Sequence, residues 1–422
     1  MQKTKITIVS YNWPPRNAIG THRPYHWAKC WAQDPRFDIT VLTAKKYTFD
    51  EPLDLNLPLL DKVKVIEVPF IKNNLKRHKL NYKFLKKIKN FLSRFLSHPI
   101  DIRSSWVTYS QPLLKEIAKN TDIVISTYGP SASHIIASQI KTLNPTCYFV
   151  ADYRDLWGLN HLSNLNKKQQ QYEIKRELKT ISNKANLLST VSQDLANQLE
   201  VYLNIKTLVV PNGFDLDLNE VKNNLNVSRN KIKKMTICYT GRIYIGHRDP
   251  TPLFKAIEQL IIEHKIKSDR VEVQIYGTGC EEVEKILRKN NNFSHFVKLY
   301  GHVDRDTVLA VQKNASLLLL LESSDPSNQG VLTGKVFEYI ATGVPILSLG
   351  SLKASAIDEL LTSTGTGICV QNQISLIKDV ILSELNGDNQ WFKPNFKKIS
   401  SYSRKNQSEV FLSKIMSLKN DY

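Results

Sequence analysis

Two short segments of the sequence combine arginine or lysine with glycine, a pairing that binds phosphate groups. Arg242 and Arg248 lie six residues apart in a glycine-containing loop, where charge-assisted hydrogen bonds could hold both phosphates of a diphosphate. Lys335 follows Gly334 at the expected start of a helix, whose positive end favours an anion. Glu338, about one turn further on, could accept hydrogen bonds from ribose hydroxyls. The alternatives are surface arginines without a role and a capped helix with solvated lysine and glutamate.

Two further loops in the first half of the chain carry groups that could bind or react. Asp152, Arg154 and Asp155 follow an expected strand at 147–151, and two acids around an arginine at a strand end favour a functional role. An ion-pair network that closes the loop is the alternative. The loop after the first expected strand contains Gly20, where backbone N–H groups could approach an anion. A plain structural turn is the alternative there.

The composition excludes several classes of protein. The 422 residues are 41% hydrophobic and 23% charged, as in ordinary globular proteins, so a disordered or low-complexity chain is excluded. The longest aliphatic run, Leu317–Leu321, is too short to span a membrane, and no secretory signal opens the sequence, so we expect a cytoplasmic protein. Five scattered cysteines without a CxxC pair favour core packing over a disulfide frame or a metal site. Val336 stands where a Walker nucleotide-binding loop requires Ser or Thr, so a Walker-type ATPase is also excluded.

The charge balance favours an anionic partner. Fifty-eight lysines and arginines against 39 acids give a net charge of +19. Residues 71–103 contain ten of the cations and one acid, with apolar residues at three- and four-residue steps. This pattern predicts a basic amphipathic helix that lies on an anionic membrane surface; packing of its apolar stripe on the first domain is the alternative. No nucleic-acid-binding motif is visible, and we expect no nucleic-acid partner.

Short runs rich in Val and Ile alternate with helix-length segments along the whole chain, which predicts parallel, doubly wound sheets. We expect strands at 5–10, 37–43, 63–68, 122–127, 147–151 and 186–191, and again at 235–240, 271–276, 297–300, 316–321, 345–349 and 367–370. A single sheet of twelve strands would exceed the usual limit of about ten. The sequence therefore predicts two Rossmann-like domains, joined near Pro211–Gly213 and the polar stretch 218–234.

The order and spacing of these motifs resemble the GT-B glycosyltransferases, and within them glycosyltransferase family 4, over nearly the whole chain. The segments that carry the likeness are Asn12–Gly20, Ser192–Leu195, Val209–Asp215, Tyr239–Arg242, Tyr276–Gly279, Tyr300–Val303 and Phe337–Ile346. Asp152–Trp157, and Pro99–Asp101 with Trp106, further resemble a branch that builds bacterial surface polysaccharides.

The resemblance implies a retaining glycosyltransferase of the α/β class, with two Rossmann-like parallel-sheet domains facing a cleft. The donor would be a nucleotide-sugar, for which we expect UDP, and the acceptor a glycan or a lipid-linked molecule; no metal or other cofactor is required. Residues 1–205 would form the acceptor-side domain and 206–394 the donor-side domain, with a helix in 395–422 crossing back to the first. We expect the enzyme in the cytoplasm, at the inner membrane face through 71–103.

Carried over residue by residue, the resemblance assigns roles to the candidates above. Arg242 and Arg248 would hold the diphosphate and Glu338 the ribose, while the backbone around His302 and Val303 would meet the nucleobase. Three further residues, Gly277, Gly334 and Lys335, complete the expected donor site, and Gly20 would let the first domain touch the diphosphate. The expected catalytic residues are Asp152, Arg154 and Asp155.

Three positions depart from the family pattern. His247 stands in place of the usual lysine, and Arg248 could serve instead. Gly330 stands where the first of two paired glutamates is expected, and the family's first-domain histidine falls at Arg154; Glu322, or Asp325, could replace the glutamate. These departures keep two alternatives open. One is a catalytically silent homologue that binds a partner, and the other is a basic scaffold for nucleic acid or membrane.

Overall fold

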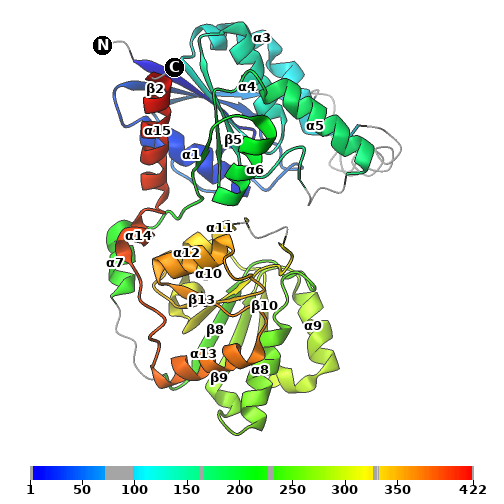
Figure 1. The fold of residues 1–422 in the computed structure, drawn as a ribbon, viewed down its shortest axis with the longest axis vertical. Coiled ribbons are helices and arrows are strands. Elements are labelled where there is room, and N and C mark those ends of the chain that lie inside the picture. The colour runs from blue at the N-terminus through cyan, green and yellow to red at the C-terminus, as the bar shows by residue number, and fades with distance from the viewer. Residues whose placement is uncertain are drawn as a thin grey trace. The chain divides into compact units, whose positions relative to one another are not determined.

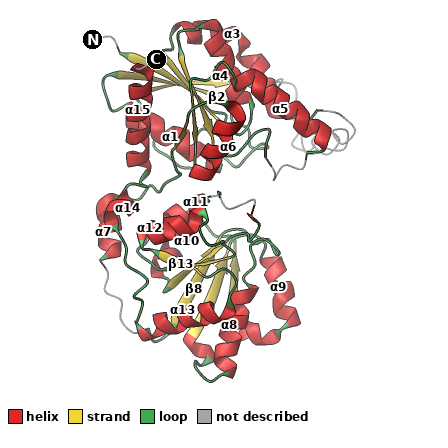
Figure 2. Ribbon diagram, in the orientation of Figure 1, coloured by secondary structure: helices red, strands yellow, loops and turns green. Residues whose placement is uncertain are grey.

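The computed structural model of the chain describes residues 3–71, 98–99, 101–160, 165–226, 232–326, 330 and 332–420. Most of the predicted amphipathic helix at 71–103 lies outside these residues. The chain divides into two compact units: Met1–Pro211 with Arg404–Tyr422, and Asn212–Ser403. Each unit is described separately (Figures 1 and 2).

The first unit is built on a parallel sheet of seven strands, in the order β3-β2-β1-β4-β5-β6-β7. The strands are β1 (Thr4–Val9), β2 (Phe37–Ala44), β3 (Val63–Val68), β4 (Ile123–Thr127), β5 (Tyr148–Tyr153), β6 (Leu187–Thr190) and β7 (Thr207–Val209). The central strands are buried along their whole length, because helices cover both faces. This explains why they appear in the sequence as short continuous apolar runs.

Helices cover the two faces of this sheet in separate groups. They are α1 (Ile19–Trp31), α3 (Ser105–Lys119), α4 (Ala132–Leu143), α5 (Lys167–Ile181), α6 (Gln193–Leu203) and α15 (Arg404–Asn420). The C-terminal α15 lies beside α1 (Figure 1). Their contact is aromatic, since the Trp27 and Phe411 ring centroids are 5.1 Å apart, and the Trp31 indole N–H donates to the Ser408 carbonyl at 2.8 Å. The last helix of the chain is therefore part of the first unit's core.

The second unit contains a parallel sheet of six strands, in the order β10-β9-β8-β11-β12-β13. The strands are β8 (Met235–Thr240), β9 (Val271–Tyr276), β10 (Val297–Gly301), β11 (Leu317–Leu321), β12 (Ile346–Leu349) and β13 (Gly367–Cys369). The helices are α7 (Leu218–Leu225), α8 (Thr251–Ile262), α9 (Cys280–Lys289), α10 (Arg305–Asn314), α11 (Gly334–Ala341), α12 (Ala356–Thr364), α13 (Ile374–Asn386) and α14 (Phe396–Ser400). Strand β11 consists of five leucines, whose side chains alternate between the two apolar clusters on either face of the sheet.

The two sheets confirm the predicted class of two Rossmann-like, doubly wound domains. In each sheet the strand order reverses once, between β1 and β4 in the first unit and between β8 and β11 in the second. The loops that leave neighbouring strands at such a switch point diverge and leave a crevice, where ligands bind in open α/β sheets. These two points are therefore where a ligand is expected to bind in each unit. No helix in the described ranges is both long enough and apolar enough to cross a membrane.

Candidate functional site

Three charged side chains gather at the switch point of the second unit. Arg248 comes from the loop after β8, Glu322 follows the last residue of β11, and Lys335 lies in the first turn of α11. A carboxylate oxygen of Glu322 is 3.9 Å from Nη2 of Arg248, and its other oxygen accepts a hydrogen bond from the Thr333 hydroxyl at 3.3 Å. The Lys335 ammonium lies 4.1 Å from the centre of the Tyr239 ring. Two cations thus share one carboxylate.

The electrostatics of this cluster leave it short of negative charge. Burial and, next in size, the nearby Arg248 guanidinium lower the pKa of Lys335 to about 7, while Glu322 and Glu338 act in the opposite direction. Burial also raises the pKa of Glu322, opposed by Arg248 and Lys335. An anionic ligand would restore the protonated state of Lys335, because it adds an opposite charge beside the ammonium. The cluster is suited to bind phosphate.

Arg242 lies near the start of the loop after β8, and its side chain is exposed. Its guanidinium stacks on the Tyr244 ring at 4.5 Å, and the Arg248 guanidinium lies 6.0 Å from the same ring. The backbone of Tyr244 pairs with that of Arg248 in an isolated β-bridge, which closes the loop through a turn with Gly246 at φ 89°. The Tyr244 ring therefore lies beside both arginines that the sequence predicts to bind a diphosphate.

A pocket of about 570 Å³ opens beside Arg242. It is lined by the loop residues 242–245 and His247 on one side and by residues 278, 279, 281 and 282 on the other. Glu281 and Glu282 lie in the first turn of α9, so the pocket holds charges of both signs. Lys335 does not line it, and the pocket is therefore separate from the cation cluster.

Glycines allow the loops of this unit to approach one another closely. Gly241 has φ 142°, and a Cβ at this position would lie 2.5 Å from Nζ of Lys335. Gly277 has φ 121°, and a Cβ there would collide with the Gly241 carbonyl group. A Cβ on Gly334 would meet no atom within 4 Å, so the start of α11 is open. Close packing and a positive φ both favour glycine at positions 241 and 277. Gly334, by contrast, leaves room for a ligand at the start of α11.

The predicted ribose and base contacts lie on neighbouring elements. Glu338, on α11, accepts a hydrogen bond from Nη2 of Arg305 at 2.9 Å. Arg305 is the first residue of α10 and follows the loop that contains His302, exposed, and Val303, half-buried. The ion pair therefore connects the expected ribose-binding carboxylate with the expected base-binding loop. Sequence reasoning missed Arg305, although its place directly after that loop was a usable signal.

In the first unit, the predicted catalytic Asp152 is completely buried and its carboxylate is fully occupied. Arg23 donates to it from Nη2 at 2.7 Å and from Nε, and the hydroxyl groups of Thr127 and Ser189 donate at 2.9 and 2.8 Å. These partners come from α1, β4 and β6, so Asp152 ties four elements together. These contacts form an ion-pair network of the kind that is the alternative to a catalytic role for this loop. A catalytic role stays a prediction. The sequence offers Arg23 as a cation near the loop after the first strand, but it does not indicate that Asp152 is its partner.

Arg154, two residues further along the chain, lies between two glycines. Nε and Nη2 of its guanidinium both donate to the Tyr128 carbonyl, at 3.0 and 2.6 Å. A Cβ on Gly20 would lie 2.8 Å from Nη1, and a Cβ on Gly129 would collide with Nη2. Asp155 is exposed to solvent. Gly20 and Arg154 are therefore brought together at the first unit's switch point, and Asp155 lies at its edge.

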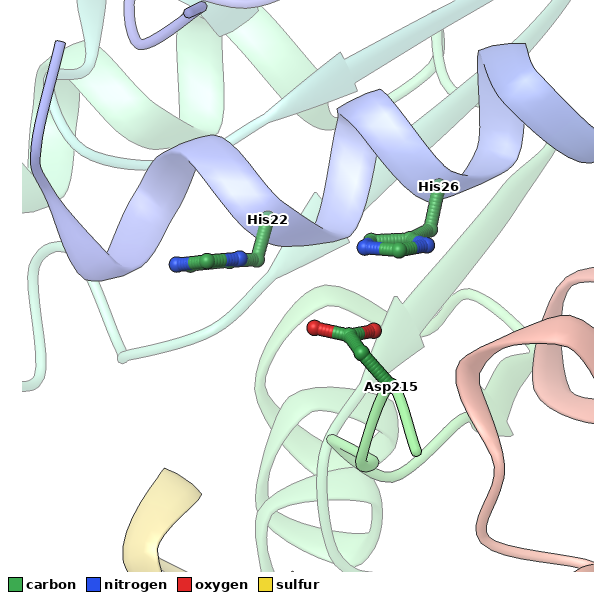
Figure 3. Close-up of side chains that lie close together, drawn as sticks. All are labelled: His22, His26 and Asp215. Carbon is green, nitrogen blue, oxygen red and sulfur yellow. The ribbon is translucent and has the colours of Figure 1, made fainter. Parts of the chain in front are cut away.

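His22 and His26 project from the same face of α1, one turn apart (Figure 3). Two imidazoles at this spacing can share a metal ion when further ligands complete its coordination. Asp215, which is drawn with them, belongs to the second unit. Neither described unit, taken by itself, gathers three His, Cys, Asp or Glu side chains within reach of one ion.

Comparison with known proteins identifies the fold. No protein-family model matches the chain, and no curated protein sequence matches it. Among solved structures, sucrose-phosphate synthase from Thermosynechococcus elongatus matches with a TM-score of 0.62 and 12% identity over 100% of both chains. The lipopolysaccharide outer core galactosyltransferase WaaB matches with 0.58 and 15%, over 98% of this chain and 99% of its own. UDP-GlcNAc 2-epimerase from Methanocaldococcus jannaschii matches with 0.52 and 12%, over 98% of this chain and all of its own.

These similarities confirm the predicted GT-B fold. At such low identities they establish the arrangement of the chain and nothing about its chemistry. Membership of glycosyltransferase family 4 stays a prediction.

Proposed function

We propose that the protein is a retaining glycosyltransferase that takes a sugar from a nucleotide-sugar donor, for which UDP is the expected nucleotide. The donor binds to the second unit, and a glycan or lipid-linked acceptor of surface polysaccharide synthesis binds to the first. The observation that carries the proposal is the cluster at the second switch point, where Arg248 lies 3.9 Å from a carboxylate oxygen of Glu322 and Lys335 interacts electrostatically with both. A diphosphate would supply the negative charge that these cations lack.

The proposed chemistry needs positive charge at the leaving group. As the bond between the sugar C1 and the diphosphate oxygen breaks, negative charge grows on that oxygen, and preorganised cations there lower the barrier by about 3–4 kcal/mol for each donor. Arg242, Arg248 and Lys335 have this role in the proposal. The acceptor hydroxyl attacks C1 from the same face, and its proton passes to the departing phosphate oxygen. This route requires neither a protein nucleophile nor a metal, and the proposal assigns none.

We also propose that residues 71–103 hold the enzyme at an anionic membrane surface on the cytoplasmic side. The proposal is supported by ten cations and one acid in the segment. Each cation near such a surface contributes about 1 kcal/mol. Sedimentation with anionic and with neutral vesicles tests it, and equal binding to both kinds of vesicle contradicts it.

The first experiment identifies the donor. Thermal-shift measurements of the full chain with UDP, GDP, ADP and CMP should show stabilisation by one nucleoside diphosphate, since a ligand that binds only the folded state raises the unfolding temperature. Sugar nucleotides of that base are then tested for transfer and for slow hydrolysis. Arg242→Ala should lose turnover. Arg288→Ala is the matched control in the same unit, because Arg288 is an exposed arginine on α9.

Three results would favour other functions. The fold is shared with UDP-GlcNAc 2-epimerase, so conversion of a sugar nucleotide into its 2-epimer without transfer would identify an epimerase. Nucleotide binding without any turnover would indicate a silent homologue. A salt-sensitive gel shift with random duplex or single-stranded nucleic acid, in the absence of nucleotide binding, would indicate the scaffold.

A further inference from the structure

The switch point of the first unit contains a guanidinium enclosed by glycines. The loops after β1 and β4 are joined there by a hydrogen bond from the Asn12 side-chain amide to the Gly129 carbonyl, at 3.1 Å. Arg154 extends from the end of β5 between Gly20 and Gly129, and a Cβ on either glycine would meet its guanidinium. Because neither glycine has a side chain, the arginine fits between them.

Part of this guanidinium has no hydrogen-bond partner among the residues that the structure describes. An arginine offers five N–H donors, and the Tyr128 carbonyl takes one from Nε and one from Nη2. Within the described ranges, no hydrogen bond uses the donors of Nη1, and no carboxylate oxygen lies within 4.0 Å of Arg154. Arg154 is half-buried, whereas Arg16 and Arg23, which are buried in this unit, each have a carboxylate partner. Burial lowers the pKa of Arg154, and the carboxylates of Asp155 and Asp152 act in the opposite direction.

Backbone donors lie beside the unused edge of the guanidinium. Helix α1 begins at Ile19, and its N-cap residue Ala18 makes no side-chain capping bond. No hydrogen bond of the described part of the chain uses the amide of Ile19 or of Gly20. Nη1 of Arg154 lies close to Gly20. A charged side chain and the positive end of a thirteen-residue helix thus face the same space.

We propose that this crevice is an oxyanion subsite, and that the acceptor carries a carboxylate or phosphate group that pairs with Arg154. The site is argued from the first unit alone, while its assignment to the acceptor rests on the proposed function. A planar guanidinium binds carboxylate or phosphate through two parallel N–H bonds, a geometry that lysine cannot reproduce. Acidic sugars and sugar phosphates are thereby favoured over neutral ones.

Titration calorimetry of the full chain tests the subsite with three probes: D-glucuronate, D-glucose 6-phosphate and D-glucose. The two anions should bind and glucose should not, and the tighter anion identifies carboxylate or phosphate as the preferred group. Arg154→Met should weaken the binding of the anions at least tenfold, since a charge-assisted pair is lost. Arg154→Lys should also weaken it, because the two parallel N–H donors of the guanidinium are lost while the charge is kept. Arg36→Met is the matched control, because Arg36 is exposed and precedes the amino-terminal end of β2, whereas Arg154 follows the carboxyl-terminal end of β5.

Equal binding of glucose and glucuronate, or unchanged anion binding by Arg154→Met, would overturn the subsite. Substitution of Arg154 also removes its hydrogen bonds to the Tyr128 carbonyl. A measurement on the unaltered protein therefore separates loss of the subsite from a change in the loop. The ¹⁵N–¹H resonance of its Nε group should shift on addition of glucuronate, and a resonance that stays in place argues against the proposal. Anion binding without any sugar transfer would support the subsite and reject the proposed function.

Discussion

The pH dependence of donor binding tests the cation cluster of the second unit most directly. In the free protein, burial and Arg248 lower the pKa of Lys335 to about 7. A bound diphosphate favours the ammonium form, so above pH 7 the lysine must take up a proton when the donor binds. The affinity is therefore full below this pKa and falls as the pH rises through it, approaching tenfold for each pH unit.

The size of the effect follows from the same pKa. With a free-state pKa of about 7 and a lysine that stays protonated in the complex, the dissociation constant should rise roughly 16-fold from pH 7.0 to 8.5, or about 1.6 kcal/mol. Titration calorimetry with the sugar nucleotide selected above measures it. A sugar nucleotide is preferable to the free diphosphate, whose terminal phosphate itself titrates near pH 6. Repeating the titration in buffers of different ionisation enthalpy counts the protons taken up.

Three variants separate this explanation from a general loss of binding. Lys335→Met should bind more weakly at low pH and show no dependence on pH. Glu322→Gln removes the carboxylate that raises the lysine pKa, and Arg248→Met removes the cation that lowers it. The pH at which affinity begins to fall should therefore move down in the first of these two and up in the second. A flat profile for the unaltered protein, or the same slope in Lys335→Met, would refute the reasoning.

Three other substitutions have defined outcomes. Arg242→Ala should weaken nucleotide binding roughly tenfold or more, because a charge-assisted bond contributes about 1.5–3 kcal/mol; its unfolding temperature without ligand should not change, since the side chain is exposed. Asp152→Asn should lower stability by about 3–5 kcal/mol, because Arg23 would stay buried without its carboxylate; urea unfolding measures this. Gly241→Ala should remove the pH dependence of donor binding, since its Cβ would displace the Lys335 ammonium, and the same calorimetric titration detects it.

The fold was predictable because the strands are buried on both faces. Runs such as Leu317–Leu321 are visible in a sequence when every side chain of a strand meets a helix. Strand β7 was not predicted, since its three residues at 207–209 are too few to form a recognisable run. A doubly wound sheet implies a reversal of strand order, but the two strands between which it falls were beyond the sequence, because apolar patterns identify strands and not their neighbours.

The candidate sites were predictable in residue type and less so in role. Glycines next to cations indicated Arg248 and Lys335, and the structure places both beside Glu322. The same kind of pattern indicated Asp152, which the fold uses to hold Arg23. Nothing in the local sequence distinguishes these outcomes, since Arg248 meets its carboxylate 74 positions away and Asp152 meets its arginine 129 positions away. A charged strand end is therefore evidence of a crevice, and only the partners decide what the charge does.

The partners also distinguish the two crevices from each other. In the second unit, Glu322 and Glu338 oppose the lowering of the Lys335 pKa, which burial and Arg248 still bring to about 7, so this lysine can lose its proton when no ligand is bound. In the first unit, the described residues place no carboxylate within 4.0 Å of Arg154, and an arginine does not escape the cost of burial by losing its proton. The two sites should therefore respond differently to pH. Donor binding should weaken above pH 7, whereas anion binding at Arg154 should stay constant over the range in which Lys335 titrates.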